Sequence, residues 1–195
     1  MRRPFALIWL FSTLILIRCS TPDFARAPEQ PAGSLRVAQT NPELRALDLS
    51  ENSTWQNDSA WPILPKLEWL SLRGNQLTEL PAGIDQLVHL RFLDLGENRF
   101  ERVPPELKNL PNLQVLFMDR NPLDSLNEDF SELSKLAVFD CWDCQIKFIH
   151  PQISEMKALQ RMDLRRNYLG TRELKWLMQL RPDIEVKSTY GCDCD

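Results

Sequence analysis

The amino-acid sequence predicts an α/β solenoid, a curved stack of short repeats with a short parallel sheet on its concave face. Three observations support this fold class: an apolar pattern that recurs at constant spacing, a strand-like alternation inside it, and atypical sequence at both ends. The chain has 195 residues, which suffice for one domain with a sizeable core.

The repeated unit carries apolar residues at its first, fourth and sixth positions and asparagine or cysteine at its ninth. Its copies begin at residues 44, 67, 90, 113, 136 and 159, so the period is 23 residues over six copies. The third copy, for example, contains Leu90, Leu93, Leu95 and Asn98 at these positions. A chance pattern would not keep its register over six copies, so the repeat indicates a regular stack.

The spacing inside each unit predicts a short strand that ends in a polar ladder. Side chains on a strand alternate between two faces, so the fourth and sixth residues point to the same side. A buried amide at the ninth position can serve the turn as both donor and acceptor. Because one repeat cannot bury its own apolar face, neighbouring repeats must supply the core. The predicted ladder consists of Asn52, Asn75, Asn98, Asn121, Cys144 and Asn167.

The second half of each repeat predicts a mostly extended or 3₁₀ convex side. The Leu-Pro and Val-Pro pairs at 80–81 and 103–104 favour extended or tight-turn backbone, because proline fixes φ and lacks a donor. One helix is expected near the C-terminus, over 171–180, where leucines fall at helical spacing. Ile184 and Val186 then alternate as a seventh, closing strand, one residue short of the full period.

These residues resemble the leucine-rich-repeat family, whose signature is L-x-x-L-x-L-x-x-N/C-x-L. The proline-containing half resembles the short LPxxIxxLxxL class of repeats, and the chain as a whole is similar to exported bacterial leucine-rich-repeat lipoproteins. The resemblance covers about residues 41–186. It implies a leucine-rich-repeat solenoid that binds a protein or peptide ligand on its concave face and uses no cofactor.

The N-terminus predicts export. Residues 1–18 read as a signal peptide, since a basic start precedes a mostly apolar run at 5–17 that is shorter than the roughly 20 residues a membrane helix needs. Two cleavage sites stay open. A partial lipobox ends at Cys19, whose lipidation would give a membrane-anchored lipoprotein of the cell envelope. An Ala-Arg-Ala site at 25–27 would give a secreted protein instead.

Three further segments follow the signal peptide. Residues 19–40 are rich in proline, alanine and glutamine without apolar periodicity, which predicts a flexible tether. Residues 41–187 form the predicted repeat domain, in which Trp55 and Trp61 cover the first core layer as an N-terminal cap. Residues 188–195 form the C-terminal tail.

Charge and motif content disfavour nucleic-acid binding and catalysis. Removal of residues 1–18, which hold three arginines, lowers Lys plus Arg from 23 to 20 against 27 acids, so the net charge changes from −4 to −7. Nucleic acid and anionic membranes both select basic surfaces, so membrane association is expected only through the lipid. His89 and His150 lie in no nucleophile or metal motif, so we predict no catalytic residue, metal or cofactor. The oligomeric state stays open.

The cysteines divide into a structural pair and a terminal pair. Cys141 and Cys144 form a C-x-x-C that could indicate zinc or redox chemistry, but they occupy the sixth and ninth positions of a repeat. The register therefore favours a structural role. Cys192 and Cys194 lie outside the repeats and could bridge another chain or a partner thiol, or belong to a tail without function.

The third, fifth and seventh positions of each repeat should line the concave face. Acidic residues flank an apolar set there, and Arg161 and Arg165 lie at its C-terminal end. Exposed aromatic residues among charges are typical of protein interfaces, although third-position residues could instead be half-buried between strands. We therefore predict an extracytoplasmic protein- or peptide-binding module; the alternative is a structural or adhesive envelope protein without one ligand. The predicted binding residues are Trp69, Phe92, Val115, Phe117, Val138 and Trp142.

Overall fold

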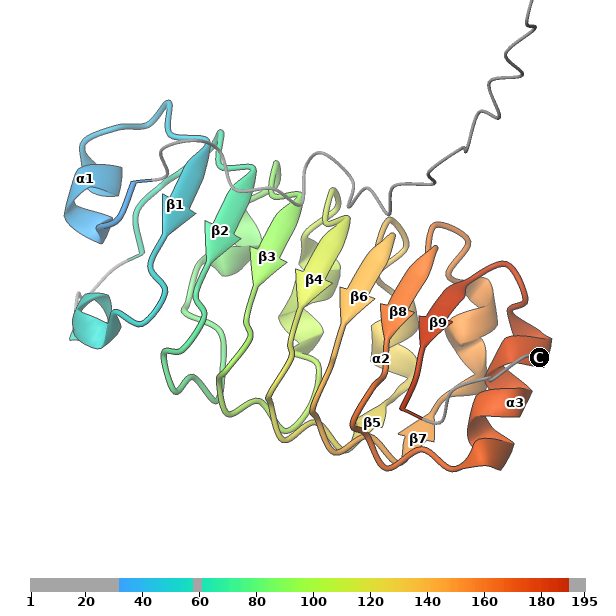
Figure 1. Cartoon of the computed structure of the whole chain (residues 1–195). Helices are drawn as coiled ribbons and strands as arrows, with labels where there is room; N and C mark the ends of the chain where they lie inside the picture. Colours follow the sequence, from blue (N-terminus) through green and yellow to red (C-terminus); the bar gives the residue numbers. More distant parts are fainter. Residues whose placement is uncertain (1–31, 58–60, 190–195) are drawn as a thin grey trace, which may run out of the picture.

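Seven short parallel strands form the main sheet of the structure, a computed structural model that describes residues 32–57 and 61–189. The first six strands begin at intervals of 23 residues, as predicted. Figure 1 shows them side by side in one row, with helical segments behind the sheet. The strands are β1 (Ala46–Asp48), β2 (Trp69–Ser71), β3 (Phe92–Asp94), β4 (Val115–Phe117), β6 (Val138–Asp140), β8 (Arg161–Asp163) and β9 (Glu185–Lys187).

The core lies between this sheet and the opposite, convex side. Leu70, Leu93 and Leu116 pair in register on successive strands and are completely buried. The sixth-position residues Leu72 and Leu95 are buried beside them. Neighbouring repeats thus share one continuous apolar core, which no single repeat could close.

The ninth-position ladder is present, and Asn98 shows how it works. Its amide nitrogen donates to the carbonyl oxygens of Leu72, Leu95 and Gly96 at 2.9–3.1 Å. Its carbonyl oxygen accepts the backbone N–H groups of Asn75 and Leu77, each at 3.0 Å. One side chain therefore satisfies backbone groups in two adjacent repeats, which ties successive turns together.

Two ladder positions depart from this pattern. Asn52 does not enter the buried ladder, because its carbonyl oxygen accepts the backbone N–H and hydroxyl of Thr54 instead. Asn52 directly precedes the 3₁₀ helix η2 (Ser53–Asn57). No full repeat precedes it, so its side-chain amide lacks the carbonyl groups of a preceding repeat, to which the later ladder residues donate. Cys144 is buried in the ladder, with its sulfur 3.3 Å from the Met118 carbonyl oxygen.

A residue with left-handed backbone conformation directly precedes each ladder position, three residues after the strand ends. Glu97 and Arg120, for example, each have φ of 55°, and glycine occupies the same place at Gly74 with φ of 68°. The sharp turn places the ninth side chain under the strand ends. The same column of residues projects from one edge of the sheet, where it contributes charges to the site described below.

The convex side consists mainly of extended segments and single-turn helices, as predicted. The 3₁₀ helices are η3 (Ile84–Gln86), η4 (Pro105–Asn109) and η5 (Pro151–Glu155), and α2 (Glu128–Ser131) is one short α-turn. A two-stranded parallel sheet joins β5 (Ser125–Leu126) to β7 (Phe148–Ile149). The longest helix is α3 (Thr171–Leu180), and it occupies the predicted residues.

The N-terminal cap extends further than predicted. The tether prediction for residues 19–40 is wrong for its last part, because Ala32 bridges to Leu47 beside β1. Helix α1 (Leu35–Gln39) follows, with Leu35 and Ala38 buried in the core. Ordering this segment buries apolar surface that the first repeat would otherwise expose.

The two tryptophans of the predicted cap occupy the expected place. Trp55 and Trp61 meet edge to face, with ring centroids 5.6 Å apart. Trp55 is buried, and its indole N–H donates to the Asn75 side-chain oxygen at 3.3 Å. The cap therefore covers the first apolar layer of the core and supplies a hydrogen-bond donor to Asn75, the first buried ladder residue.

The closing strand lies one residue beyond the period rather than one short of it. Val186 pairs with Met162, an interval of 24 residues, because α3 and its exit turn occupy more chain than the short convex segments. The signal peptide at 1–18, the Cys19 lipidation site and the tail cysteines Cys192 and Cys194 lie outside the described residues.

Candidate functional site

The third-position residues of the predicted binding stripe are largely buried. Trp69, Phe92, Val115 and Val138 are 9%, 3%, 0% and 8% exposed, and with Ala46 they form a second apolar cluster on the sheet. Trp69 lies flat on Phe92, with ring centroids 5.1 Å apart and planes within 5°. Strands about 4.8 Å apart let such side chains cover one another. The expectation of an exposed stripe is therefore wrong for these four residues.

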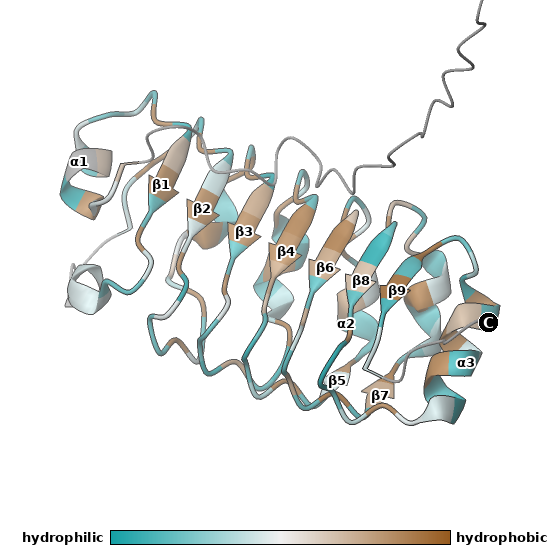
Figure 2. Ribbon diagram, viewed as in Figure 1, coloured by the Kyte–Doolittle hydropathy of each residue, from teal (hydrophilic) through white to brown (hydrophobic). Residues whose placement is uncertain are grey.

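The remaining two predicted residues are accessible. Phe117 and Trp142 are half-buried and belong to the fifth- and seventh-position columns. Phe117 also contacts the apolar cluster, since its ring meets Phe92 edge to face at 5.2 Å. Figure 2 shows hydrophobic character along β3, β4 and β6 that ends at the hydrophilic β8. The two accessible residues therefore lie in the middle of the sheet, Phe117 on β4 and Trp142 just after β6.

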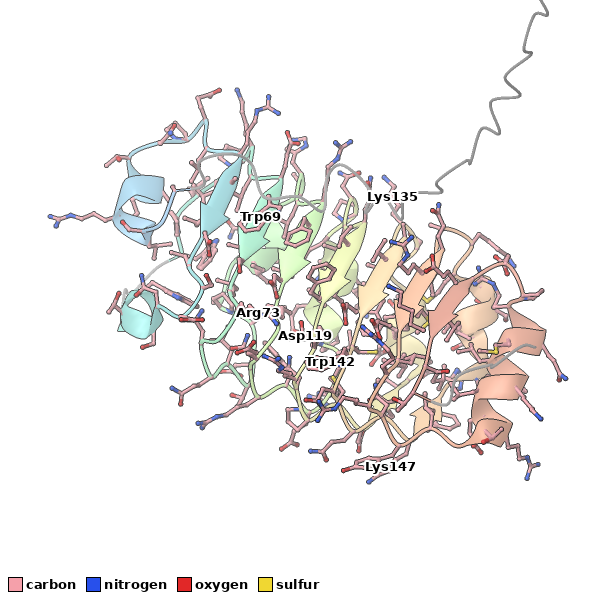
Figure 3. All side chains as sticks on the ribbon, viewed as in Figure 1. Trp69, Arg73, Asp119, Lys135, Trp142 and Lys147 are labelled. Atoms are coloured by element: carbon pink, nitrogen blue, oxygen red, sulfur yellow. The ribbon has the colours of Figure 1, made fainter. Side chains whose placement is uncertain are left out.

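Phe117 and Trp142 line a hollow of about 330 Å³ at the C-terminal ends of the strands, which we name the concave pocket. In Figure 3, Arg73, Asp119 and Trp142 gather below the strand ends, away from Trp69. Its volume lies at the lower end of the range for small-ligand sites, roughly 300–1,000 Å³. The pocket is lined by Arg73, Asp94, Phe117, Asp119, Asp140, Trp142 and Arg165.

Arg73 crosses two repeats at one side of this pocket. Its guanidinium donates to Asp119 at 2.9 Å and to Asp94 at 3.0 Å, and it lies 3.3 Å from Glu97. Burial acts to lower the pKa of Arg73, but the Asp119 hydrogen bond and the nearby carboxylates outweigh it, so the pKa is raised. The arginine is therefore held charged and fully partnered.

Gly96 makes this crossing possible. A Cβ atom at Gly96 would come within 2.1 Å of an Arg73 guanidinium nitrogen and 2.6 Å of an Asp119 oxygen. Because Gly96 has no side chain, the Arg73 side chain can pass over it and reach Asp119, two repeats further along the chain. The requirement at this position is for space, not for an unusual backbone conformation.

Asp140 presents a different situation at the centre of the pocket. Its side chain accepts the Trp142 backbone N–H at 3.0 Å, and no lysine or arginine of the described residues makes an ion pair with it. Burial raises the pKa of Asp140 from 3.8 to about 6, and the charges of Asp163 and Asp119 act in the same direction. A carboxylate with a perturbed pKa in a hollow is a typical feature of functional sites.

The rim of the pocket carries arginines that stack on Trp142. The guanidinium carbon of Arg120 lies 4.7 Å from the indole ring centre, and that of Arg166 lies 5.2 Å from it. Both arginines also pair with acids, Arg120 with Glu97 at 2.5 Å and Arg166 with Asp143 at 3.0 Å. The indole position is therefore supported by two cation–π contacts, and the Trp142 backbone is held by its hydrogen bond to Asp140.

The C-x-x-C pair lies behind the sheet and not in the pocket. Cys141 and Cys144 are buried free thiols. Burial raises the pKa of Cys144 to about 12 and that of Cys141 well above its usual value. Neither thiol is activated as a nucleophile or redox group at neutral pH, so both fill repeat positions as predicted. Among residues 32–57 and 61–189, no cluster of potential ligands could hold a metal ion.

The sequence reading missed the polar half of the pocket. Arg73, Asp119 and Asp140 stand in the fifth- and seventh-position columns and were visible as acids or arginines on the concave face. The signal that could have found them is Gly96, the one seventh-position residue without a side chain, which lets Arg73 reach Asp119.

A second hollow lies near the C-terminal end of the solenoid. Its volume is also about 330 Å³, and Phe148 of β7 and Trp176 of α3 line it. Phe148 is 51% exposed, which makes it a prominent apolar side chain away from the sheet. Within the described part of the chain, no helix is both long and apolar enough to cross a membrane.

Comparison with known proteins identifies the repeats. A family model described as a leucine-rich repeat region matches residues 32–180. A leucine-rich-repeat protein of Leptospira interrogans is 32% identical over 64% of this chain, with a TM-score of 0.59. This chain spans only about a third of that protein, since 32% of the Leptospira chain is covered. No curated protein sequence matches the chain.

Two Listeria monocytogenes proteins show the same fold. Internalin C2 is 24% identical, with a TM-score of 0.66 over 82% of this chain and 67% of its own. A second internalin is 21% identical, with a TM-score of 0.60 over 82% of this chain and 45% of its own. Solenoids of this architecture serve as interaction scaffolds that use extended concave surfaces. With its six 23-residue repeats, asparagine ladder and seven-stranded parallel sheet, the chain belongs to the leucine-rich-repeat family.

Proposed function

We propose that this chain is an extracytoplasmic module that binds a protein or peptide ligand in the concave pocket. The observation that carries the proposal is the pairing of two accessible aromatic rings, Phe117 and Trp142, with fixed charges in one hollow. Aromatic residues that are rigid and surrounded by charged groups are typical of binding hot spots. The buried Phe92, on which Trp69 stacks, meets the Phe117 ring edge to face and supports its position.

The extracytoplasmic part of the proposal rests on the N-terminal residues. A basic start, an apolar run and Cys19 favour export and lipid attachment, with secretion after cleavage near residue 27 as the second possibility. Mass spectrometry of the mature N-terminus separates the two: a lipidated Cys19 supports the lipoprotein, and an unmodified Pro28 supports the secreted form. A mature chain that still begins at Met1 would contradict cleavage at either site and indicate an uncleaved N-terminal anchor.

Selection of binders from a displayed random-peptide library tests the binding function. Peptides selected on the immobilised chain should lose about 2 kcal/mol of binding, roughly 30-fold in affinity, on Phe117→Ala or Trp142→Ala. Phe148→Ala is the matched control, because it truncates an exposed aromatic residue far from the concave pocket. Circular dichroism establishes that each variant is folded. A loss in Phe148→Ala alone would place binding at the second hollow, and a library without saturable binders would contradict the proposal.

A further inference from the structure

We infer that the concave pocket receives a basic side chain of the ligand, with the Asp140 carboxylate as its counter-charge and Phe117 as an aromatic wall. The inference rests on the proposed function and adds the chemical class of the residue that is recognised. Its basis is the distribution of charges around the pocket, which leaves one acid without a cation.

The arginines of the pocket are all paired. Arg73 is shared by Asp94 and Asp119, and Arg165 pairs with Asp163 at 2.6 Å. The rim arginines Arg120 and Arg166 pair with acids of their own, as described above. An anionic ligand would therefore compete for these guanidinium groups with acids already beside them, which disfavours an acidic partner.

Asp140 is the exception in this arrangement. It lies between Phe117 on β4 and Asp163 on β8 in the pairing register, so its neighbours across the sheet are an aromatic ring and another acid. No cation of the described residues makes an ion pair with it. A guanidinium or ammonium group in the pocket would supply the missing charge, and partial burial would strengthen that interaction relative to water.

The walls of the pocket suit a long cationic side chain. Cations bind favourably over aromatic faces, and the methylene stem of lysine or arginine packs on apolar surface. The volume of about 330 Å³ admits one such side chain. The rest of the ligand would then lie along the sheet beside the pocket.

The inference predicts a pH dependence of binding. Asp140 has a pKa of about 6 in the free protein, so it is ionised at pH 7 and largely protonated at pH 5. Protonation removes the counter-charge, so affinity for a basic ligand should fall across this interval. The other charged groups that face Asp140 are Asp119 and Asp163, which raise its pKa, and Arg165, which lowers it.

The test uses the whole chain and the peptides selected from a displayed random library. Selected peptides should share an arginine or lysine, and replacing it by neutral citrulline or norleucine should weaken binding at least tenfold. Asp140→Asn should cause a loss of the same size, and Asp140→Glu should retain most of the affinity. Asp85→Asn is the control, because it removes a carboxylate from an exposed convex residue.

Each outcome has a separate meaning. If selected peptides bind at Phe117 and Trp142 but contain no basic residue, or bind Asp140→Asn as tightly as the parent, the inference is wrong and the binding function stands. If no saturable peptide is found, the proposed function itself fails. Loss of binding at pH 5 in the parent but not in Asp140→Asn would support the role of this carboxylate directly.

Discussion

At the scale of single residues, the concave pocket holds a carboxylate that costs stability. Asp140 is mostly buried, and its one described hydrogen bond comes from the Trp142 backbone. A buried charge without a partner is unfavourable, and proteins retain such groups mainly where they serve a function. The raised pKa of Asp140 is consistent with this cost, because burial favours the neutral acid in the folded state.

Replacement of this charge should stabilise the fold. The pKa of Asp140 rises from 3.8 to about 6 on folding, so the folded state binds the proton more tightly and the ionised group is destabilising above pH 6. Asp140→Asn should therefore raise the free energy of unfolding by about 1–3 kcal/mol at pH 7. The gain should disappear near pH 4, where the carboxyl is neutral in the folded protein. Urea melts from pH 4 to pH 8 measure it; a gain that does not change with pH would refute the assignment.

The ladder gives a second prediction at this scale. Asn98→Ala removes the acceptor of two backbone N–H groups, those of Asn75 and Leu77, which should cost about 3 kcal/mol. The three carbonyl oxygens that it also bonds each keep one other donor. Cys144→Asn should be neutral or stabilising, because it restores an amide where a thiol bonds the Met118 carbonyl weakly. Denaturant melts of both variants test this, and a large loss for Cys144→Asn would mean that the thiol packs better than the amide.

At the scale of elements, the C-terminal end of the solenoid is closed by one buried arginine. Arg181 follows α3 and donates to the carbonyl oxygens of Ile153, Met156 and Leu159 at 2.9–3.1 Å. It also pairs with the exposed Asp183, whose pKa is lowered to about 2 by the hydrogen bond from Arg181. The arginine thus joins η5, the start of β8 and the turn after α3.

Removal of this arginine should destabilise the end of the domain strongly. Arg181→Met removes the side-chain donors from three buried carbonyl groups, two of which keep a backbone N–H partner, and should cost about 3 kcal/mol in urea melts. Arg181→Lys should recover little, because one ammonium group lacks the planar fork that reaches all three carbonyls. Asp183→Asn is the control and should have a small effect, since it leaves the carbonyl hydrogen bonds intact. Equal losses in Arg181→Met and Asp183→Asn would contradict this account.

The regular elements could be predicted from sequence, and the irregular ones could not. The period predicted β1, β2, β3, β4, β6 and β8, because each copy repeats the same alternation and an asparagine or cysteine at its ninth position. Helix α1 was missed because its five residues have no counterpart in the repeats and too few apolar positions to show periodicity. The concave columns named Phe117 and Trp142 correctly as accessible residues, but exposure depends on how neighbouring rings cover one another. The flat stacking of Trp69 on Phe92 is such a case.

At the scale of the whole molecule, the repeats that provide stability and the pocket proposed for binding occupy different positions along the axis of the solenoid. Each repeat contacts mainly its neighbours, so the ends must be protected while the middle carries the accessible surface. The N-terminal end is covered by α1 and Trp55, and the C-terminal end by α3 and Arg181. The concave pocket lies over β2 to β8, between these two closures. A rigid middle keeps its charges and rings in place for a partner.

This linear arrangement predicts that damage to one end stays near that end. Leu35→Ser places a hydroxyl in the buried face of α1 and should loosen the cap without unfolding the distant repeats. In hydrogen exchange, amides of residues 46–57 should lose protection most, and those of β6 and β8 least. Leu180→Ser is the control, because this residue is 36% exposed on α3. A uniform loss of protection from β1 to β9 would show that the solenoid unfolds as a single cooperative unit, and that α1 stabilises the pocket as well as the end of the stack.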